Sequence, residues 1–374
     1  MAGHLNRTAI LNLALLLSGI VTTMLGPLLP AFQSRWALND AQAGLLFPAQ
    51  FLSAVAIAAV VGPLARRYGY FALIAPGLLL MALGTALCAF GSWPLAVGGV
   101  MVYGCGQGLA ITSANLGTAA EEAQGRARAI VMLNLSWCIG AVIAPQLVAS
   151  LGRVFLPSVA AAVAVSAALV AAYCGSGPRP RAVDGMSRIS RAGWLASAMM
   201  FLYVGSESSI AGWISALATR AADTRALWAI LPSVFWGGML VGRTLAQPAL
   251  SRVAARTLVP AGLLGASAAA AVLIANPSGA ATVTAGALTG FGLAPVFPLV
   301  VAQYGERSSA PSGLVFSAAG LGGGVIPPFI GWLSTATRSL RAGMAIVLPL
   351  IAIIFWLQIQ LAREAPVSAP RRTS

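Results

Sequence analysis

The sequence has few charged residues and lacks them altogether over two long stretches. No Asp, Glu, Lys or Arg occurs between Arg67 and Glu121, or between Arg256 and Glu306. Charged residues make up 8% of the 374 residues and apolar residues make up 59%, whereas about a quarter of a soluble domain is charged. One soluble core could not bury so much apolar surface. The composition excludes a soluble globular protein and predicts a chain that crosses a membrane repeatedly.

Other absences exclude several kinds of chemistry. One His and four scattered Cys make a metal centre or a disulfide framework improbable on spacing. The sequence has no phosphate-binding loop of the Walker kind, so we expect neither an enzyme nor an ATP-driven pump, and no cofactor. The formal charge is +14, but the arginines stand singly or in pairs between apolar runs. They form no stripe that would favour nucleic acid as a partner.

The apolar runs predict an all-α integral membrane fold with twelve transmembrane helices. Crossing roughly 30 Å of hydrocarbon takes about 20 apolar residues in a helix. The runs lack the alternation that is typical of membrane-spanning strands. The predicted spans are 8–33, 40–64, 71–91, 94–118, 128–151, 154–174, 193–218, 227–250, 258–275, 280–303, 311–335 and 341–361.

The arginines predict the orientation, because cytosolic loops carry the excess of basic residues. With the N-terminus in the cytosol, six arginines fall in outer loops and Arg243 falls inside a span. We therefore expect a multi-pass protein of the cell membrane, of the bacterial inner membrane type, with both termini cytoplasmic. The inner arginines are Arg7, Arg66, Arg67, Arg126, Arg128, Arg179, Arg181, Arg188, Arg191, Arg252, Arg256, Arg307, Arg363, Arg371 and Arg372.

The two halves of the chain are similar when one is shifted by about 185 residues. Gly104 and Gly106 in span four then match Gly290 and Gly292 in span ten. We expect a six-helix bundle over 1–174, a cytosolic linker over 175–192 and a second bundle over 193–374. Parallel repeats of this kind are typical of one transporter architecture.

Over its whole length the chain resembles the major facilitator superfamily. The loop Gly62–Gly69 resembles the loop motif after span two, although Arg66 stands where Asp is usual. Motifs in four spans resemble the fucose-permease-like branch of sugar:proton symporters. These motifs are Tyr203–Trp213, Phe235–Gly238 with Gly242 and Arg243, Gly290–Pro298, and Ser312 and Gly313 with Gly322–Gly324, Pro327 and Pro328.

The resemblance implies a monomeric secondary transporter that imports a sugar or related polar metabolite together with protons, by alternating access. The first half departs from the branch, since spans one and four carry no acidic residue and Trp137 stands where a His is often found. The alternatives are an exporter of drugs or metabolites in exchange for protons, a different coupling ion, and a non-transporting sensor that kept the fold. The expected partners are a small-molecule substrate, the proton and the lipid bilayer.

Glu207 is the acidic residue that lies well inside a predicted span. A carboxylate at that depth costs a few kcal/mol, so it should face a cavity or a partner. We expect Glu207 to couple protons to transport, the alternative being a carboxyl that only braces neighbouring helices. Tyr203 lies one turn before it on the same helix face.

Arg243 is the basic residue inside a span, and its depth differs from that of Glu207 by roughly 10 Å. The two can pair directly only if their side chains reach toward one another. Otherwise Arg243 braces the inner mouth by bonding carbonyl groups or Glu306. Together with Arg66, Arg67 and Arg252, it is a candidate gating residue.

Uncharged polar and aromatic side chains complete the expected cavity. Amides donate and accept hydrogen bonds and aromatic rings stack on sugar faces, so they suit a hydroxyl-rich solute. Each of them could instead bond only a neighbouring helix. The substrate-cavity candidates are Gln50, Gln107, Asn115, Asn134, Trp137, Gln146, Tyr203, Trp213, Trp236 and Gln303.

The first prediction tests the topology. On a background without native cysteines, Cys at positions 92 and 278 should react with an impermeant thiol reagent added to intact cells, because Ser92 and Ser278 fall in outer loops. Cys residues placed within 180–190 should react only after the membrane is opened. Labelling of both sets from one side would contradict the twelve-span model.

Overall fold

The computed structural model describes residues 2–121, 126–180, 189–250, 253–276, 278–300 and 313–363. Within these ranges the chain is helical, with short connections and no strand. A described helix lies within each of the twelve predicted spans. This agreement confirms the expected all-α membrane fold.

Both halves contain six spans, some of them interrupted. The helices of the first half are α1 (Ala2–Thr23), α2 (Leu25–Trp36), α3 (Asp40–Gly44), α4 (Leu46–Tyr68), η1 (Phe71–Leu73), α5 (Ile74–Ala89), α6 (Trp93–Ala120), α7 (Arg126–Leu151), η2 (Gly152–Val154) and α8 (Phe155–Tyr173). Those of the second half are α9 (Arg191–Thr219), η3 (Ala222–Leu227), α10 (Ile230–Leu250), α11 (Ala255–Ala275), α12 (Gly279–Leu293), α14 (Gly313–Thr337), α15 (Leu340–Met344) and α16 (Val347–Arg363).

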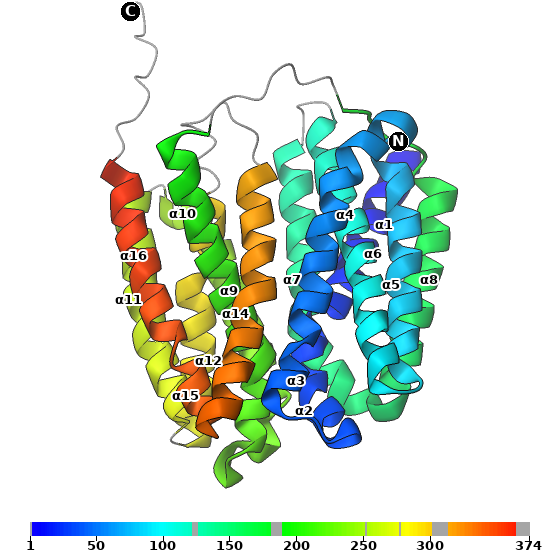
Figure 1. Cartoon of the computed structure of the whole chain (residues 1–374). Coiled ribbons are helices and arrows are strands. Elements are labelled where there is room, and N and C mark those ends of the chain that lie inside the picture. Colours follow the sequence, from blue (N-terminus) through cyan, green and yellow to red (C-terminus); the bar gives the residue numbers. More distant parts are fainter. Residues whose placement is uncertain are drawn as a thin grey trace, which may run out of the picture.

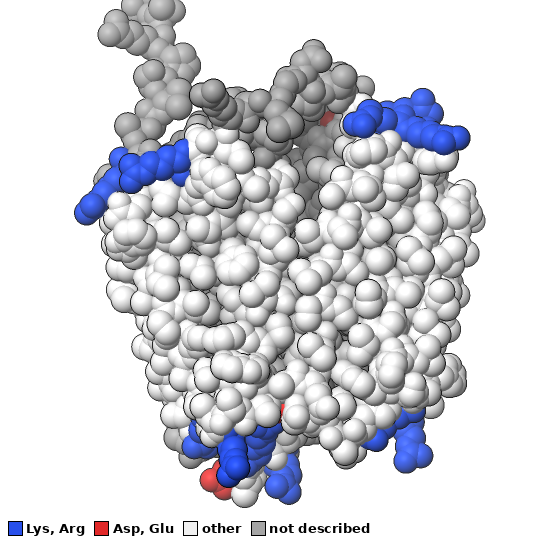
Figure 2. All heavy atoms as spheres, viewed as in Figure 1, with Lys and Arg blue, Asp and Glu red and all other residues white. Residues whose placement is uncertain are grey.

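The hydrophobicity of the helices fits a bilayer. Nine helical stretches of the described residues are long and apolar enough to cross a membrane, and one of them, Arg128–Tyr173, contains both α7 and α8. Helix α10 is apolar over the shorter range Ile230–Ala246. On the face shown in Figure 2, arginine side chains gather at the two ends and leave a band without charge between them.

The helices form two groups that lie side by side, α1–α8 and α9–α16 (Figure 1). Helix α6 packs on α4 and α5 in the first group, and α12 packs on α10 and α11 in the second. Helices α2, α3, α4 and α7 contact α9, α14 and α10 across the boundary. Helix α1 begins and α16 ends at one end of the molecule, here named the terminal end, and α2, α3 and α15 lie at the opposite end (Figure 1).

A repeated glycine contact relates the two groups. A Cβ atom on Gly104 of α6 would overlap with the carbonyl group of Gln50 in α4. A Cβ atom on Gly290 of α12 would overlap in the same way with the carbonyl group of Phe235 in α10. These pairs correspond under the shift of about 185 residues, so both halves use Gly to bring the same two helices together.

Three spans are interrupted near the opposite end, each shortly before a proline. Proline has no N–H group, and its ring clashes with the carbonyl four residues earlier. The first two interruptions separate helices that reach across to the other half, α2 to α9 and α3 to α14, whereas α15 contacts α14, α9 and α11 of its own half. They follow Thr23, Gly44 and Met344, and the prolines are Pro27, Pro48 and Pro349.

Candidate functional site

Glu207 and Arg243 form an ion pair between α9 and α10. Oε2 of Glu207 lies 3.7 Å from Nη2 of Arg243, and the exposed fractions of the two side chains are 11% and 22%. A Cβ atom tilts toward the N-terminus of its helix. Because α9 and α10 run in opposite directions (Figure 1), Glu207 leans toward the terminal end and Arg243 leans away from it. The depth difference is therefore bridged.

The pair leaves hydrogen-bonding capacity unused. Glu207 Oε2 and Arg243 Nε are buried and have no hydrogen-bond partner. The Nη1 group of Arg243 donates to the Cys138 thiol on α7 at 3.3 Å, and a sulfur atom is a weak acceptor. An unmet donor or acceptor costs about 1–3 kcal/mol when it is buried. The pair thus keeps one acceptor and one donor that no described side chain satisfies.

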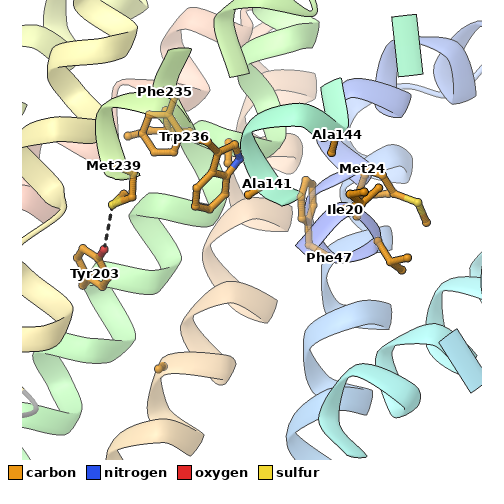
Figure 3. Close-up of a cluster of buried hydrophobic side chains, with 14 of the residues drawn as sticks. Ile20, Met24, Phe47, Ala141, Ala144, Tyr203, Phe235, Trp236 and Met239 are labelled. Atoms are coloured by element: carbon orange, nitrogen blue, oxygen red, sulfur yellow. Dashed lines mark hydrogen bonds between the residues drawn. The ribbon is translucent and has the colours of Figure 1, made fainter. Parts of the chain in front are cut away.

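Tyr203 lies beside the charged pair, as its position one turn before Glu207 predicts. It is fully buried, and its ring interacts electrostatically with both Glu207 and Arg243. Its hydroxyl group donates to Met239 Sδ at 3.8 Å (Figure 3). The pair therefore has a polar hydroxyl on one side and the sulfur atoms of Met239 and Cys138 nearby.

Two tryptophans meet across the boundary between the halves. The rings of Trp137 on α7 and Trp236 on α10 are 5.5 Å apart at an angle of 83°, an edge-to-face arrangement. Trp236 extends from α10 toward Ala141 of α7, with Phe235 beside it (Figure 3). Trp137 is followed by Cys138, which accepts from Arg243. One turn of α7 therefore contacts both Trp236 and Arg243 of α10.

Gln50 and Gln107 belong to a separate hydrogen-bond network inside the first half. Gln50 Nε2 donates to Gln107 Oε1 and to the carbonyl oxygen of Thr22, both at 3.0 Å. The hydroxyl group of Tyr103 donates to Gln50 Oε1 at 3.2 Å. These bonds join α1, α4 and α6. Their role in a substrate cavity stays a prediction.

The other amide candidates also bond neighbouring helices. Asn134 Nδ2 on α7 donates to Asn115 Oδ1 on α6 at 3.4 Å. Gln146 Nε2 on α7 donates to the carbonyl oxygen of Ala229 at 3.0 Å and to the Ser233 hydroxyl at 3.2 Å. The Gln146 bonds cross between the halves, whereas the Asn134 bond does not.

The remaining candidates lie apart from the ion pair. Trp213 is fully buried, and its indole N–H donates to the carbonyl oxygen of Pro327 at 3.0 Å. Arg66 and Arg67 are exposed at the terminal end of α4, and Arg67 stacks on Tyr68 at 5.1 Å. Gln303 and Arg252, like Glu306, lie outside the described residues.

The sequence analysis missed a charged cluster that joins the halves at the opposite end. Asp40 of α3 is buried and accepts from Arg220 Nη1 at 2.9 Å and from a second guanidinium nitrogen of that residue. It also accepts from the Ser334 hydroxyl and from Gln33 Nε2 at 2.6 Å. We name these four residues the Asp40 cluster. Asp40 and Gln33 belong to the first half, Arg220 and Ser334 to the second.

A local signal for this cluster exists in the sequence. Asn39 caps α3 in a reciprocal capping box with Gln42, which places Asp40 in the first turn, where a helix favours negative charge. That pattern predicts a helix start but not a partner 180 residues away. A polar hollow of about 450 Å³ opens beside the cluster, lined also by Thr335 and Arg338.

Another hollow in the described part of the chain is apolar. It measures about 360 Å³ and lies between α10, α11 and α12, where Gly242, Gly262 and Phe291 line it. None of the predicted site residues contributes to its lining. Among the described residues no group of three or more His, Cys, Asp or Glu side chains could hold a metal ion.

Comparison with known proteins identifies the family. The family model described as the Major Facilitator Superfamily matches residues 11–302. The chain belongs to the Major Facilitator Superfamily. Members of this superfamily are transporters, so the protein is a multi-pass membrane transporter.

Related proteins differ in what they carry. Over 144 residues the chain is 28% identical to the niacin transporter NiaP of Acinetobacter baylyi, and this match covers 38% of the chain and 33% of that protein. The fold is similar to that of a bacterial homologue of the human lysosomal transporter Spinster in an inward-facing, occupied conformation, with a TM-score of 0.78, 16% identity, and coverage of 97% of this chain and 98% of that one.

Two sugar:proton symporters share the fold at low identity. The fucose:proton symporter of E. coli gives a TM-score of 0.67 at 21% identity, with coverage of 95% of this chain and 98% of that one. A D-xylose–proton symporter gives 0.78 at 12% identity, with coverage of 97% and 98%. At these identities the likeness concerns the fold.

The second prediction concerns the Asp40 cluster. Asp40→Asn keeps the shape of the side chain but removes the charge that binds Arg220. The contact between the halves at the opposite end should weaken by about 1 kcal/mol, and the population in which the halves are separated at that end should rise roughly fivefold. Spin labels on Cys at the exposed positions of Ser34 and Ala226 would report the distance between the halves. The matched control is Asp223→Asn, which changes an exposed acid near the same end. An unchanged distance distribution in Asp40→Asn would contradict the prediction that the Asp40 cluster holds the halves together at this end.

Proposed function

We propose that this transporter moves a small polar solute, a sugar or a related metabolite, by alternating access coupled to a proton gradient. The observation that carries the proposal is the buried Glu207–Arg243 pair, which lies deep within its helices and keeps two polar atoms without partners. Such a site is costly in a membrane and is typical of proton and substrate pathways.

Glu207 is the proposed proton carrier. Its carboxylate balances the charge of Arg243, whose guanidinium stays protonated at all relevant pH values. Protonation of Glu207 would release Arg243 from the pair. Arg243 also contacts Cys138 in the other half, so a change of charge at Glu207 reaches the boundary between the halves through a single side chain.

The proposed orientation places the terminal end in the cytosol, following the excess of arginines in the predicted inner loops. The Asp40 cluster then joins the halves on the outer side, and the described conformation corresponds to an inward-facing state. Residues 1–174 and 193–374 would move as two bundles about the linker 175–192. We place the protein as a monomer in the bacterial inner membrane.

The relatives support this proposal without deciding the solute. Fucose and xylose symporters with proton coupling share the fold, and a niacin transporter shares part of the sequence. Trp137 is partly exposed, with Trp236 packed behind it, and its ring is the kind of surface that flat solutes stack on. A thermal-shift screen of the purified protein against sugars, polyols, organic acids and lipophilic cations would select the probe for transport assays.

The third prediction tests proton coupling at Glu207. In proteoliposomes, Glu207→Gln should abolish accumulation of the selected probe against its gradient, because the amide mimics the protonated acid and does not titrate. Exchange of the probe between equal compartments should persist, with a weaker dependence on pH. Radiolabelled uptake with and without an imposed pH gradient measures both quantities.

The exposed acid Asp223 supplies the control, since Asp223→Asn removes a charge outside the membrane-spanning helices. This variant should accumulate the probe as the original protein does. If Glu207→Gln still concentrates the probe in response to a proton gradient, Glu207 is a bracing carboxyl and not the proton carrier. If the proton gradient instead drives the probe out in exchange for protons, the result would favour the alternative function, an exporter of drugs or metabolites.

A further inference from the structure

We infer that the transported solute carries a carboxylate, which binds Arg243 in place of Glu207 while Glu207 takes up a proton. This inference rests on the proposed function and names the substrate class of the same site. A small acid and a proton would then cross the membrane together. The carboxylate would be joined to a flat body, either an aromatic ring or a sugar ring.

The unused donors of Arg243 are the first argument. A guanidinium has five N–H donors arranged to fit a carboxylate with two parallel bonds. Here Nη1 donates to a thiol at 3.3 Å, the guanidinium also interacts with the neutral Tyr203 hydroxyl, Nε has no partner, and Glu207 Oε2 is 3.7 Å from Nη2. That separation gives attraction without a hydrogen bond. A ligand with two acceptor oxygens would satisfy what the protein leaves unmet.

The charges around Glu207 are the second argument. Six elements pack against α9, namely α2, η3, α10, α14, α15 and α16. Arg243 of α10 is their charged residue near Glu207, whereas the others lie at the two ends of the molecule: Arg35, Asp223, Arg225, Arg341 and Arg363. On α7 the nearby titratable group is Cys138, and on α9 itself it is Tyr203. When Glu207 is protonated, the described residues leave Arg243 without a counter-charge, and a bound anion would supply one.

The relative exposure of the two partners indicates which of them the solute meets. Arg243 is 22% exposed at its side chain, twice the value of Glu207. Glu207 can become neutral by binding a proton, whereas Arg243 cannot lose its charge. A cationic solute would need Glu207 to be the accessible partner. The geometry therefore favours an acid over an amine.

The tryptophans set the size of the solute. Trp236 lies seven residues before Arg243, two turns along the same face of α10, which is a rise of roughly 10 Å. Trp137 meets Trp236 from the other half. Trp236 is buried behind Trp137, which is partly exposed, so a carboxylate at Arg243 would place a body of one ring, or of two small ones, against the Trp137 indole. Nicotinate and glucuronate both fit this description.

The exchange keeps the charge of the site constant. The empty site holds one guanidinium cation and one carboxylate anion. The loaded site holds the cation, the anion of the solute and a neutral Glu207, with one proton gained from the solvent. No covalent bond other than the O–H bond changes. Transport of an acid with one proton is electroneutral, whereas transport of a neutral sugar with one proton would carry a positive charge.

The fourth prediction compares each acid with its neutral counterpart. Calorimetric binding to the purified full-length protein would use nicotinate against nicotinamide, and glucuronate against glucose. At least one acid should bind about tenfold more tightly than its partner, since a charge-assisted bond is worth about 1.5–3 kcal/mol. Arg243→Gln should remove that preference, and Arg243→Lys should restore part of it. The exposed Arg225→Gln is the control.

Glu207→Gln separates this inference from a structural role. Removing the competing carboxylate should make the acid bind more tightly by severalfold and with less dependence on pH, whereas loss of a merely bracing residue would weaken binding. Because Arg243→Gln leaves Glu207 buried without its counter-charge, the double variant Glu207→Gln/Arg243→Gln provides a neutral site. In that variant the preference for acids should still be absent.

Proteoliposomes complete the test. Uptake of the preferred acid should follow an imposed pH gradient and should not change when a potassium diffusion potential is set with valinomycin. The inference is overturned if neither acid binds more tightly than its neutral partner, or if uptake responds to the potential. Proton-driven accumulation of a neutral sugar would overturn it too, but would leave the proposed proton coupling intact.

Discussion

The exclusion of water from the bilayer is the constraint on which the rest of the structure depends. Without water, every backbone group must bond within its own helix, and each charge must find a partner or a cavity. The long uncharged stretches from Arg67 to Glu121 and from Arg256 to Glu306 are the consequence in the sequence. Against that background a carboxylate and a guanidinium on adjacent helices stand out. Their retention at such a cost points to function, because apolar residues would pack there more cheaply.

Close helix packing and helix interruption have different places in this fold: the first occurs within each half and the second where the halves meet. Glycines such as Gly104 and Gly290 bring helices of the same half into backbone contact, which makes each half a compact body. Prolines such as Pro27 and Pro48 break the spans where the halves meet at the opposite end. The short helices that result carry Asp40 and its neighbours across the boundary. Rigidity within a half and adaptable ends between halves are what alternating access requires.

The sequence predicts the spans well because span length and apolar character are local properties fixed by membrane thickness. It also places Glu207 deep inside a span, since a single acid in an apolar run is visible without any tertiary information, and the role of this residue stays a prediction. The pairing with Arg243 could not be settled in advance, because it depends on the lean of both side chains. The Asp40 cluster was missed for a stronger reason: its partners lie 180 and 294 residues away. The same limit applies to the amides, whose hydrogen bonds to neighbouring helices depend on helix rotation.

The two charged groups differ in how they connect the halves, and this difference suggests a division of roles. The central pair lies within one half and touches the other through the Cys138 thiol, while Trp236 of the same helix as Arg243 meets Trp137 edge to face. Such contacts are weak and depend little on direction, so they can persist while the helices shift relative to each other. The Asp40 cluster instead joins the halves through directional bonds to a buried carboxylate, and these are either made or broken. Two bundles that rotate against each other need both kinds of contact. A weakly directional contact near the centre persists during the rotation, and a directional contact at the end is made in one state and broken in the other. Under the proposed mechanism, charge changes at Glu207 act at the central contact, so they would bias the Asp40 cluster only through the relative position of α7 and α10.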